Sequence, residues 1–323
     1  MPEGNQDVVA SAQEIWQRLS NGDDPTTRRP AELIRAASAK LARAGLSSPA
    51  VDARCLLRCA SGLNAAQLLT SSPLETSIVD EFWQLIERRA AGVPVQHLTG
   101  VAPFRHAEIV VGPGVFIPRP ETELVAGAAI DEVLRLQCGQ LPVQVVELCA
   151  GSGAISRSIL DEAPGVNLTA VEISADALPY LHRNLSGQAE ASGAVDVLHA
   201  DLAELLNLRP ELAGGVDVVV VNPPYVPTAQ RLPLDVHADP AVALFGGLDG
   251  LDVIRELLPV AAELLRPGGL LIMEHGDDQG SQVVDLLIAA GFSEAEDHYD
   301  LTERPRFSTA RRAALTDDRT EEL

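Results

Sequence analysis

The fold of this 323-residue chain is decided by the stretch Val143-Gln144-Val145-Val146-Glu147-Leu148-Cys149-Ala150-Gly151-Ser152-Gly153-Ala154. Its first half, 143–148, is an apolar run with the length and composition of a buried parallel strand. The glycines that follow let the backbone approach a ligand closely, and a helix expected at 154–162 offers free N–H donors at its N-terminus. The spacing differs from the G-x-G-x-x-G dinucleotide fingerprint. The stretch therefore predicts either a site for a nucleotide-like ligand or simply a tight strand-to-helix turn.

The same alternation of strand and helix continues towards the end of the chain. Strands are expected at 143–148, 166–171, 195–199, 216–221 and 270–274, helices at 154–162, 175–185, 251–265 and 279–290, and a final antiparallel pair at 296–299 and 306–311. This pattern is typical of a doubly wound α/β domain. We therefore predict a seven-stranded Rossmann-like domain over residues 121–311.

Residues 30–92 carry helical periodicity instead. Leu33, Ala37 and Leu41 recur at four-residue spacing. Ser48-Pro49 is a helix-start signal, and Asn64 is suited to cap a short third helix. A last helix is expected at 75–91, with an apolar stripe formed by Ile78, Phe82, Leu85 and Ile86. The pattern predicts a small helical-bundle domain that docks a substrate.

Three further segments complete the predicted organisation. Residues 1–29 are polar and are expected to form a flexible N-terminal arm, with one amphipathic turn at Ile15, Trp16 and Leu19. Residues 93–120 are expected to form a β-hairpin connector, in which 95–101 pairs with 108–111. Residues 312–323 form an acidic tail.

The charge balance limits the partners. The chain has 24 Lys and Arg against 46 Asp and Glu, which gives a formal net charge of −22. Phosphate backbones repel such a field, and no cluster of Lys and Arg is present to offset it, so nucleic acid is a disfavoured substrate. A basic protein partner is compatible with this charge, because opposite fields steer the encounter. We expect a monomer.

The cysteines and the hydropathy pattern indicate the compartment. Cys55, Cys59, Cys138 and Cys149 do not resemble a disulfide framework or a metal site, and small buried side chains are the favoured interpretation. No apolar run approaches the roughly 20 residues that a membrane span needs. The N-terminus lacks the basic and apolar regions of a signal peptide. We expect a cytoplasmic protein.

Two acidic residues follow the next two predicted strands. Glu172 comes about 20 residues after the glycine turn, where a carboxylate can accept both ribose hydroxyls of a nucleoside. A helix N-terminal acid is the alternative reading of Glu172. Asp201 could accept the exocyclic amine of an adenine, or it could be an ordinary loop residue. Together these residues favour a nucleoside without naming the cofactor.

The stretch Asn222-Pro223-Pro224-Tyr225 follows the fourth strand and carries the chemistry. Two prolines fix the backbone and remove two N–H donors, which leaves a rigid loop that presents acceptors. The Asn222 oxygen and a proline carbonyl can hold both hydrogens of one NH₂ group, and Tyr225 offers a ring to a flat substrate or to a sulfonium cation. This arrangement orients the lone pair of a weakly nucleophilic amide and stabilises positive charge on its nitrogen. The loop predicts methylation of a planar nitrogen.

Longer strings around these motifs resemble a known family. They are Gln96-His97-Leu98-Thr99-Gly100, Gly114-Val115-Phe116-Ile117-Pro118-Arg119-Pro120-Glu121-Thr122-Glu123, Asn222-Pro223-Pro224-Tyr225-Val226, Ala243-Leu244-Phe245-Gly246-Gly247-Leu248-Asp249-Gly250-Leu251 and Glu274-His275-Gly276 with Gln279. Over residues 30–311 the chain is similar to the release factor glutamine methyltransferases, also called the HemK or PrmC family. The Pro-Arg-Pro-Glu-Thr-Glu string is very specific, whereas Asn-Pro-Pro-Tyr also occurs in DNA amino-methyltransferases.

The resemblance implies a substrate, a cofactor and a site. The substrate is the glutamine of the Gly-Gly-Gln motif in class 1 peptide chain release factors, which S-adenosylmethionine would methylate to yield N5-methylglutamine and S-adenosylhomocysteine. By this resemblance the glutamine amide is held by Asn222 and Pro223, in a pocket lined by Phe116, Pro224 and Tyr225. The cofactor is held by Cys149, Ala150, Gly151, Ser152, Gly153, Glu172 and Asn222, with Asp201 and Leu202 near the adenine. Cys149 stands where the family has the first glycine of its turn.

Three other functions compete with this one. A DNA adenine or cytosine amino-methyltransferase would use the same loop on a flipped base, but the charge of −22 argues against it. A nucleoside-binding regulator without catalysis would not need an intact Asn222. An NAD-dependent oxidoreductase would need a different glycine spacing. No metal site is expected.

Overall fold

The computed structural model describes residues 29–139, 142–187, 193–232, 236 and 238–314. Nearly all of the predicted arm at 1–29 and of the predicted tail at 312–323 lies outside these residues. The chain divides into two compact units, the first made of the residues up to Gly100 together with the short segment 234–238, and the second of the remaining residues.

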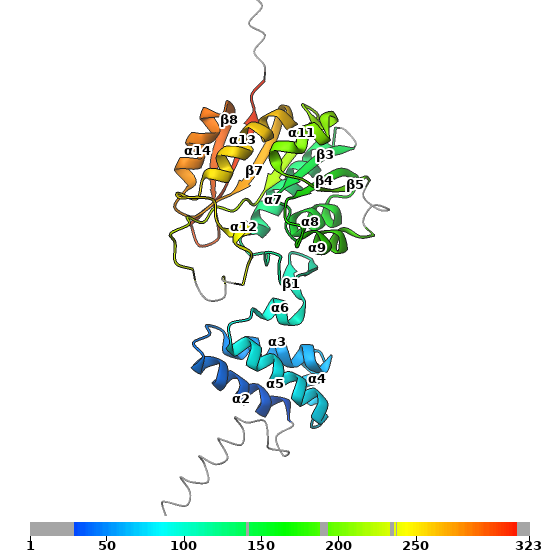
Figure 1. Ribbon diagram of the computed structural model, residues 1–323. Helices are drawn as coiled ribbons and strands as arrows, with labels where there is room; N and C mark the ends of the chain where they lie inside the picture. The colour runs from blue at the N-terminus through cyan, green and yellow to red at the C-terminus, as the bar shows by residue number, and fades with distance from the viewer. Residues whose placement is uncertain (1–28, 140–141, 188–192, 233–235, 237, 315–323) are drawn as a thin grey trace, which may run out of the picture. The chain divides into compact units, whose positions relative to one another are not determined.

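The first unit is helical, as predicted (Figure 1). Its helices are α2 (Pro30–Arg43), α3 (Pro49–Ser61), α4 (Ala65–Thr70), α5 (Thr76–Ala90) and α6 (Val95–Thr99). Pro30 and Pro49 occupy the first position of their helices, where the missing N–H costs nothing. Asn64 forms a capping box with Gln67 at the start of α4.

A single apolar core holds these helices together. Leu33, Ala37 and Leu41 of α2 are fully buried in it. On α5 the buried stripe includes Val79 in place of the expected Ile78, which is only partly buried. The carboxylate of Asp52 accepts a hydrogen bond of 2.7 Å from Arg89, so the two buried charges compensate each other.

The connector differs from the prediction. Residues 95–99 form the helix α6 and not a strand. Pro94 enters with φ of −57°, and Gly100 ends the helix in the left-handed conformation that glycine adopts without strain. The hairpin itself is present but shorter, because β1 (Val101–Phe104) pairs with β2 (Ala107–Val110).

The second unit contains the predicted seven-stranded sheet. Its strands are β3 (Val143–Leu148), β4 (Val166–Glu172), β5 (Val195–His199), β6 (Val216–Val221), β7 (Leu265–Glu274), β8 (Phe292–Tyr299) and β9 (Pro305–Arg312). They lie in the order β5-β4-β3-β6-β7-β9-β8, in which the first five strands pair parallel and β9 pairs antiparallel with both β7 and β8. β7 begins at Leu265 and not at the predicted Leu270, and its pairing with β6 has an irregular register between Val216 and Val218.

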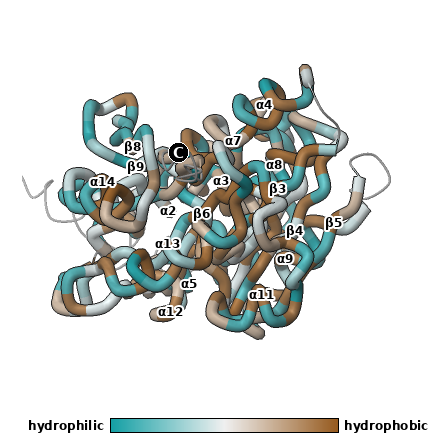
Figure 2. The backbone as a smooth tube through the Cα atoms, turned by 90° about the horizontal axis from the view of Figure 1, so that it is seen from above, coloured by the Kyte–Doolittle hydropathy of each residue, from teal (hydrophilic) through white to brown (hydrophobic). Residues whose placement is uncertain are grey.

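Helices cover both faces of this sheet. They are α7 (Thr122–Gln137), α8 (Ala154–Glu162), α9 (Leu178–Leu185), α13 (Asp252–Leu264) and α14 (Gly280–Ala289), with short turns at η1 (Leu202–Glu204), α11 (Leu205–Leu208), η2 (Pro210–Leu212) and α12 (Ala241–Leu244). Val218 and Val220 of β6 pack with α7, α8 and α9, whereas Val219 and Val221 pack with α13 and α14. Figure 2 shows hydrophobic residues along the central strands. The alternation explains why a doubly covered strand is apolar throughout.

The helix α7 was not predicted. Val125, Ala129 and Val133 recur at four-residue spacing and are fully buried, so the signal was present in the sequence.

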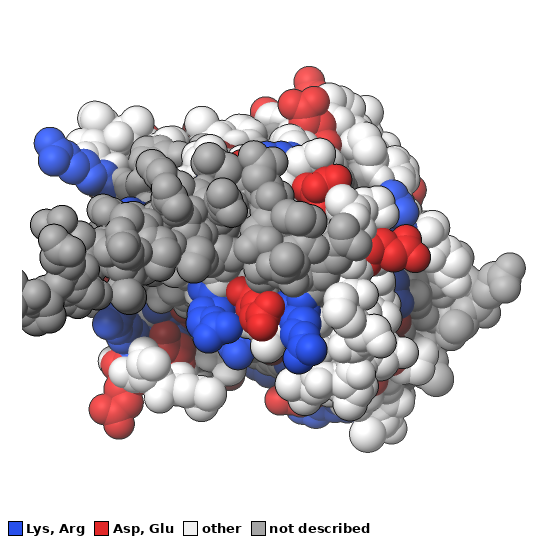
Figure 3. Space-filling model, turned by 90° about the horizontal axis from the view of Figure 1, so that it is seen from below, with Lys and Arg blue, Asp and Glu red and all other residues white. Residues whose placement is uncertain are grey.

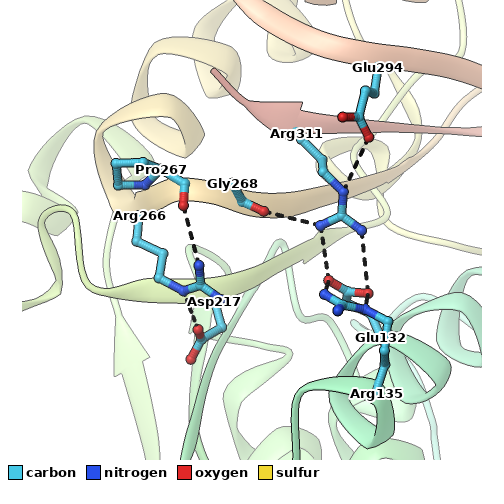
Figure 4. Close-up of polar contacts among 8 residues, drawn as sticks. All are labelled: Glu132, Arg135, Asp217, Arg266, Pro267, Gly268, Glu294 and Arg311. Atoms are coloured by element: carbon cyan, nitrogen blue, oxygen red, sulfur yellow. Dashed lines mark hydrogen bonds and ion pairs between the residues drawn. The ribbon is translucent and has the colours of Figure 1, made fainter. Parts of the chain in front are cut away.

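Two groups of charged side chains link the strands of the sheet to one another and to α7 (Figure 4). Arg311 on β9 donates hydrogen bonds to Glu132 on α7 and to the Gly268 carbonyl, at 3.0 and 3.1 Å. Asp217, the one acid within β6, pairs with Arg266 and accepts the Gln144 N–H of β3 at 2.8 Å. Asp217 therefore receives hydrogen bonds from both strands that flank β6, which offsets the cost of burying its carboxylate.

We expect Asp217→Ala to destabilise the protein by about 1–3 kcal/mol, because it leaves the Gln144 N–H of the buried sheet without its acceptor. Thermal unfolding measures the effect. Glu211→Ala, which removes an exposed ion pair with Arg209, is the matched control and should change the unfolding temperature little. Equal losses in the two variants would contradict the role given to Asp217.

Candidate active site

A cavity of about 240 Å³ lies at the carboxyl ends of the central strands in the second unit. Its walls come from the loops that follow β3, β4, β5 and β6, which is where an open α/β sheet binds its ligands. The predicted site residues that line it are Phe116, Cys149, Ala150, Gly151, Ser152, Glu172, Asp201, Leu202, Asn222, Pro223, Pro224 and Tyr225. The structure thus brings together residues that are far apart in the sequence.

Gly153 is the predicted site residue that does not line the cavity. It has φ of +77° at the N-cap of α8, and a Cβ there would lie 2.5 Å from Leu181 of α9. The glycine is therefore required for a left-handed turn and for close packing of two helices.

Glu172 shapes the glycine turn as well as facing the cavity. Its Oε2 accepts the Gly151 N–H and its Oε1 accepts the Ser174 N–H, both at 2.7 Å. Each carboxylate oxygen can accept a second hydrogen bond, so the group remains able to bind ligand hydroxyls. One side chain thereby fixes the turn and offers acceptors beside it.

Cys149 departs from the glycine that its position favours. Its φ is +55°, in the left-handed region that costs a residue with a side chain roughly 1–2 kcal/mol. Burial raises the pKa of its thiol to about 12, and the neighbouring carboxylates of Glu172, Glu147 and Asp201 add to the shift. The thiol therefore stays protonated and has no nucleophilic role at neutral pH.

The electrostatics of the cavity suit a cation. Its acidic lining residues are Glu147, Glu172, Asp201 and Glu256, and the described lining contains no Lys, Arg or His. Burial raises the pKa of Glu147 to about 8, with a further contribution from Glu172. The carboxylates of Glu172 and Asp201 would repel a phosphate-bearing dinucleotide, whereas they would attract a ligand with a sulfonium and an ammonium group.

Asp201 and Leu202, which are predicted to lie near an adenine, stand at the start of η1. Asp201 caps this turn, since its Oδ1 accepts the Ala203 N–H at 2.9 Å. Leu202 packs against the apolar cluster that also contains Cys149. The pair combines a carboxylate with an apolar surface, as an adenine ring and its amine require.

The loop after β6 presents acceptors to the cavity. Asn222 uses its Nδ2 to donate to the Thr122 hydroxyl at 3.3 Å, which directs its Oδ1 away from Thr122. Within the described residues the Pro223 carbonyl accepts no hydrogen bond. The Tyr225 hydroxyl donates to Glu274 at 3.1 Å, and burial raises its pKa well above the ordinary value. The Tyr225 hydroxyl therefore stays protonated at neutral pH, and its ring is the part of the side chain left to face a ligand.

A glycine-rich segment, 246–250, holds this loop in place. A Cβ on Gly250 would lie 2.1 Å from the Tyr225 carbonyl, and one on Gly246 would lie 2.4 Å from the Pro224 carbonyl. Gln279 completes the support by donating to the Tyr225 carbonyl at 3.0 Å. Only backbone without side chains can approach the loop this closely.

Phe116 forms another part of the cavity wall. Arg119 lies over its ring at 5.1 Å and forms an ion pair with the fully buried carboxylate of Asp239. Asp239 also accepts the Ile117 N–H at 3.1 Å. The aromatic wall is therefore fixed from behind by one acid.

Sequence reasoning did not assign roles to Thr122, Glu274 or Asp239. Thr122 and Glu274 lie within the strings that carry the family resemblance, which was an available signal. Asp239 carried no motif, and only its position in space reveals it.

The described residues offer neither a metal-binding cluster nor a membrane-spanning helix. They contain no group of three or more His, Cys, Asp or Glu arranged to hold a metal ion. In that same part of the chain, no helix combines the length and the hydropathy needed to cross a membrane.

Comparison with known proteins places this site in a family. The model described as the PrmC N-terminal domain matches residues 32–100, and the one described as the methyltransferase small domain matches residues 125–236. A release factor glutamine methyltransferase of Streptomyces coelicolor is 43% identical over 284 residues, which are 87% of this chain and 97% of the relative. The chain belongs to the release factor glutamine methyltransferase family. Relatives of the same name from Mycolicibacterium smegmatis and Bifidobacterium longum are 40% and 39% identical, covering 87% and 85% of this chain and 97% of each relative.

Membership makes the protein an S-adenosylmethionine-dependent methyltransferase. The cavity fits that cofactor, because its acidic lining complements a sulfonium cation and Glu172 retains acceptors for ribose hydroxyls. The N-terminal family match ends at residue 100, where the main segment of the first compact unit also ends.

We expect Gly250→Ala to reduce methyl transfer strongly, since the new Cβ would displace the Tyr225 carbonyl. A displacement of about 1 Å at a reacting loop can cost about 100-fold in rate. Gly268→Ala is the matched control, because Gly268 has a similar positive φ of +77° but no atom within 4 Å of the added Cβ. Steady-state kinetics on both variants measure the effect, and similar rates would refute a supporting role for 246–250.

Glu147 gives a prediction about pH. Between its ordinary pKa of 4.5 and the folded value of about 8, the folded state holds a proton that the unfolded state has lost, so stability falls as pH rises through this window. Glu147→Gln carries no such proton. The unfolding temperature of the variant, relative to wild type, should therefore rise from pH 4.5 to pH 8 and then level off.

Thermal scans across this pH range measure the difference. Glu263→Gln, which replaces an exposed carboxyl on α13, is the matched control. A wild-type minus Glu147→Gln difference that is the same at every pH would show that Glu147 is not perturbed by its burial.

Proposed function

We propose that this protein transfers a methyl group from S-adenosylmethionine to the side-chain amide of the glutamine in the Gly-Gly-Gln motif of class 1 peptide chain release factors. The products are N5-methylglutamine and S-adenosylhomocysteine. The observation that carries the proposal is similarity over 97% of the length of relatives named for this activity, across both units. The site geometry supports the same reaction from independent evidence.

The loop after β6 supplies what an amide nucleophile lacks. Its nitrogen lone pair is delocalised into the carbonyl, so it must be oriented and its developing positive charge stabilised. The Asn222 Oδ1 and the Pro223 carbonyl are the two acceptors available for the NH₂ hydrogens. The extra proton can leave after transfer, which explains why the reaction needs no strong base.

The remaining lining residues divide between cofactor and substrate. S-adenosylmethionine supplies an electrophilic methyl group on a sulfonium, and residues 149–152 with Glu172 and Asp201 are the groups that would hold it. Phe116 and Tyr225 offer aromatic surfaces to the flat amide. Pro223 and Pro224 keep the acceptors rigid between the two.

A DNA base is the alternative owner of a planar NH₂ group. The net charge of −22 opposes a phosphate backbone. On the part of the face that Figure 3 shows in colour, Lys and Arg side chains lie beside Asp and Glu side chains. Family membership also favours a protein substrate. We further infer a monomer that acts in the cytoplasm, where free thiols such as these four persist.

We expect Asn222→Ala to lower methyl transfer by at least about 100-fold, because it removes an acceptor that acts on the transition state. Binding of S-adenosylmethionine, measured by calorimetry, should persist. Mass spectrometry of the Gly-Gly-Gln peptide after reaction measures the transfer, and the exposed Asn207→Ala is the matched control. Labelling of duplex DNA in place of release factor would overturn the proposed function.

A further inference from the structure

A side-chain amide such as Asn222 can face a substrate with either end. Its oxygen and its NH₂ group have nearly the same shape, so only hydrogen-bond partners decide the orientation. The proposed reaction needs the oxygen towards the cavity, because an NH₂ group there would repel the substrate amide. The residues behind Asn222 therefore control whether the site is competent.

Thr122 is the partner behind Asn222, but alone it cannot set the orientation. Its Oγ1 accepts from the Asn222 Nδ2 at 3.3 Å. A threonine hydroxyl can donate as well as accept, so it could equally bind the Asn222 oxygen. The choice depends on where the single hydroxyl proton of Thr122 is directed.

Glu274 provides the acceptor for that proton. This carboxyl lies at the end of β7, is 1% exposed and accepts the Tyr225 hydroxyl through Oε1 at 3.1 Å. Burial raises its pKa, and the neighbouring Thr122 and Tyr225 hydroxyls act in the opposite direction by favouring the charged form. Its Oε2 is buried and, among the described residues, has no partner at standard hydrogen-bond geometry, so it retains the capacity to accept.

We propose that Glu274 and Thr122 are positioning residues, which together hold the Asn222 amide with its oxygen towards the substrate. The inference rests on the proposed function and deepens it. When the ionised Glu274 takes the Thr122 proton, Thr122 can only accept, and the Asn222 NH₂ group must face it. The Asn222 oxygen then points into the cavity. The same carboxylate accepts a hydrogen bond from the Tyr225 hydroxyl. One buried charge thus positions both Asn222 and Tyr225, the first and last residues of the loop 222–225.

Protonation of Glu274 would release this control. A neutral carboxyl can itself donate to Thr122, which frees the Thr122 proton to bind the Asn222 oxygen and lets the amide turn. Burial raises the pKa of Glu274 to about 7. The charged groups that act on it are Arg306 of β9, which favours ionisation, and Glu121 before α7, which opposes it. The neighbouring His275 is directed elsewhere, towards Ser308 and Asp297.

Paired substitutions of Thr122 test the proposal. Thr122→Val keeps the shape and removes the hydroxyl, whereas Thr122→Ser retains it. With release factor as substrate, we expect Thr122→Val to lower kcat by about 10- to 100-fold and Thr122→Ser to keep most of the activity. KM for release factor and the Kd for S-adenosylmethionine should change little in both. A Thr122→Val variant that keeps at least half of the wild-type kcat would overturn the proposal.

The pH profile separates positioning from a merely structural role. Wild-type kcat should fall as pH is lowered through about 7, and this step should be absent in Thr122→Val and in Glu274→Gln. An unchanged step in both variants would contradict the role of Glu274.

A third measurement does not depend on the substrate. The side-chain NH₂ signal of Asn222 in nuclear magnetic resonance spectra, assigned by its loss in Asn222→Asp, should exchange slowly with water in wild type and faster in Thr122→Val. Equal exchange would overturn the proposal. If wild type fails to methylate release factor, the proposed function fails, and the exchange measurement still decides the role of Thr122.

Discussion

The parallel pairing of β3 with β6 is the constraint on which the site depends. These strands are far apart in the sequence but adjacent in the sheet, and their register places Leu148 beside Val221. The chain runs outwards from β3 through β4 to β5 and returns at β6, so this is the point where the strand order reverses. The next residues, Cys149 and Asn222, therefore leave the sheet side by side. The glycine turn after β3 and the Asn222 loop after β6 are neighbours because these two apolar strands pair.

Charge then determines what the crevice between the loops can hold. Glu147, Glu172 and Asp201 approach it from three different strands, and the described lining offers no cation in return. Ionising all of these carboxylates together is costly without a counter-charge, and Glu172 adds to the rise that burial causes in the pKa of Glu147. A sulfonium cofactor offsets that cost, and its product has lost the sulfonium charge after transfer. The same electrostatics that attract the cofactor thus favour release of the spent form.

Most of this sheet could be predicted from the sequence, because parallel strands that are buried on both faces consist of continuous apolar runs. The bounds of β3, β5 and β6 agree with the prediction to the residue. The helices α6 and α7 were not predicted, because both precede β3, where the regular alternation of strands and helices begins. Asn222 and Glu172 stood out because motifs mark strand ends. Thr122, Glu274 and Asp239 did not, because their contacts are set by residues distant in sequence, such as the 100 positions between Thr122 and Asn222.

A crystal structure with S-adenosylhomocysteine and a Gly-Gly-Gln peptide would test the central claim most directly. The account predicts the cofactor across the glycine turn and Glu172, and the glutamine amide nitrogen within hydrogen-bond distance of both the Asn222 oxygen and the Pro223 carbonyl. A glutamine bound elsewhere, or an Asn222 amide that presents its NH₂ group to the substrate, would contradict it.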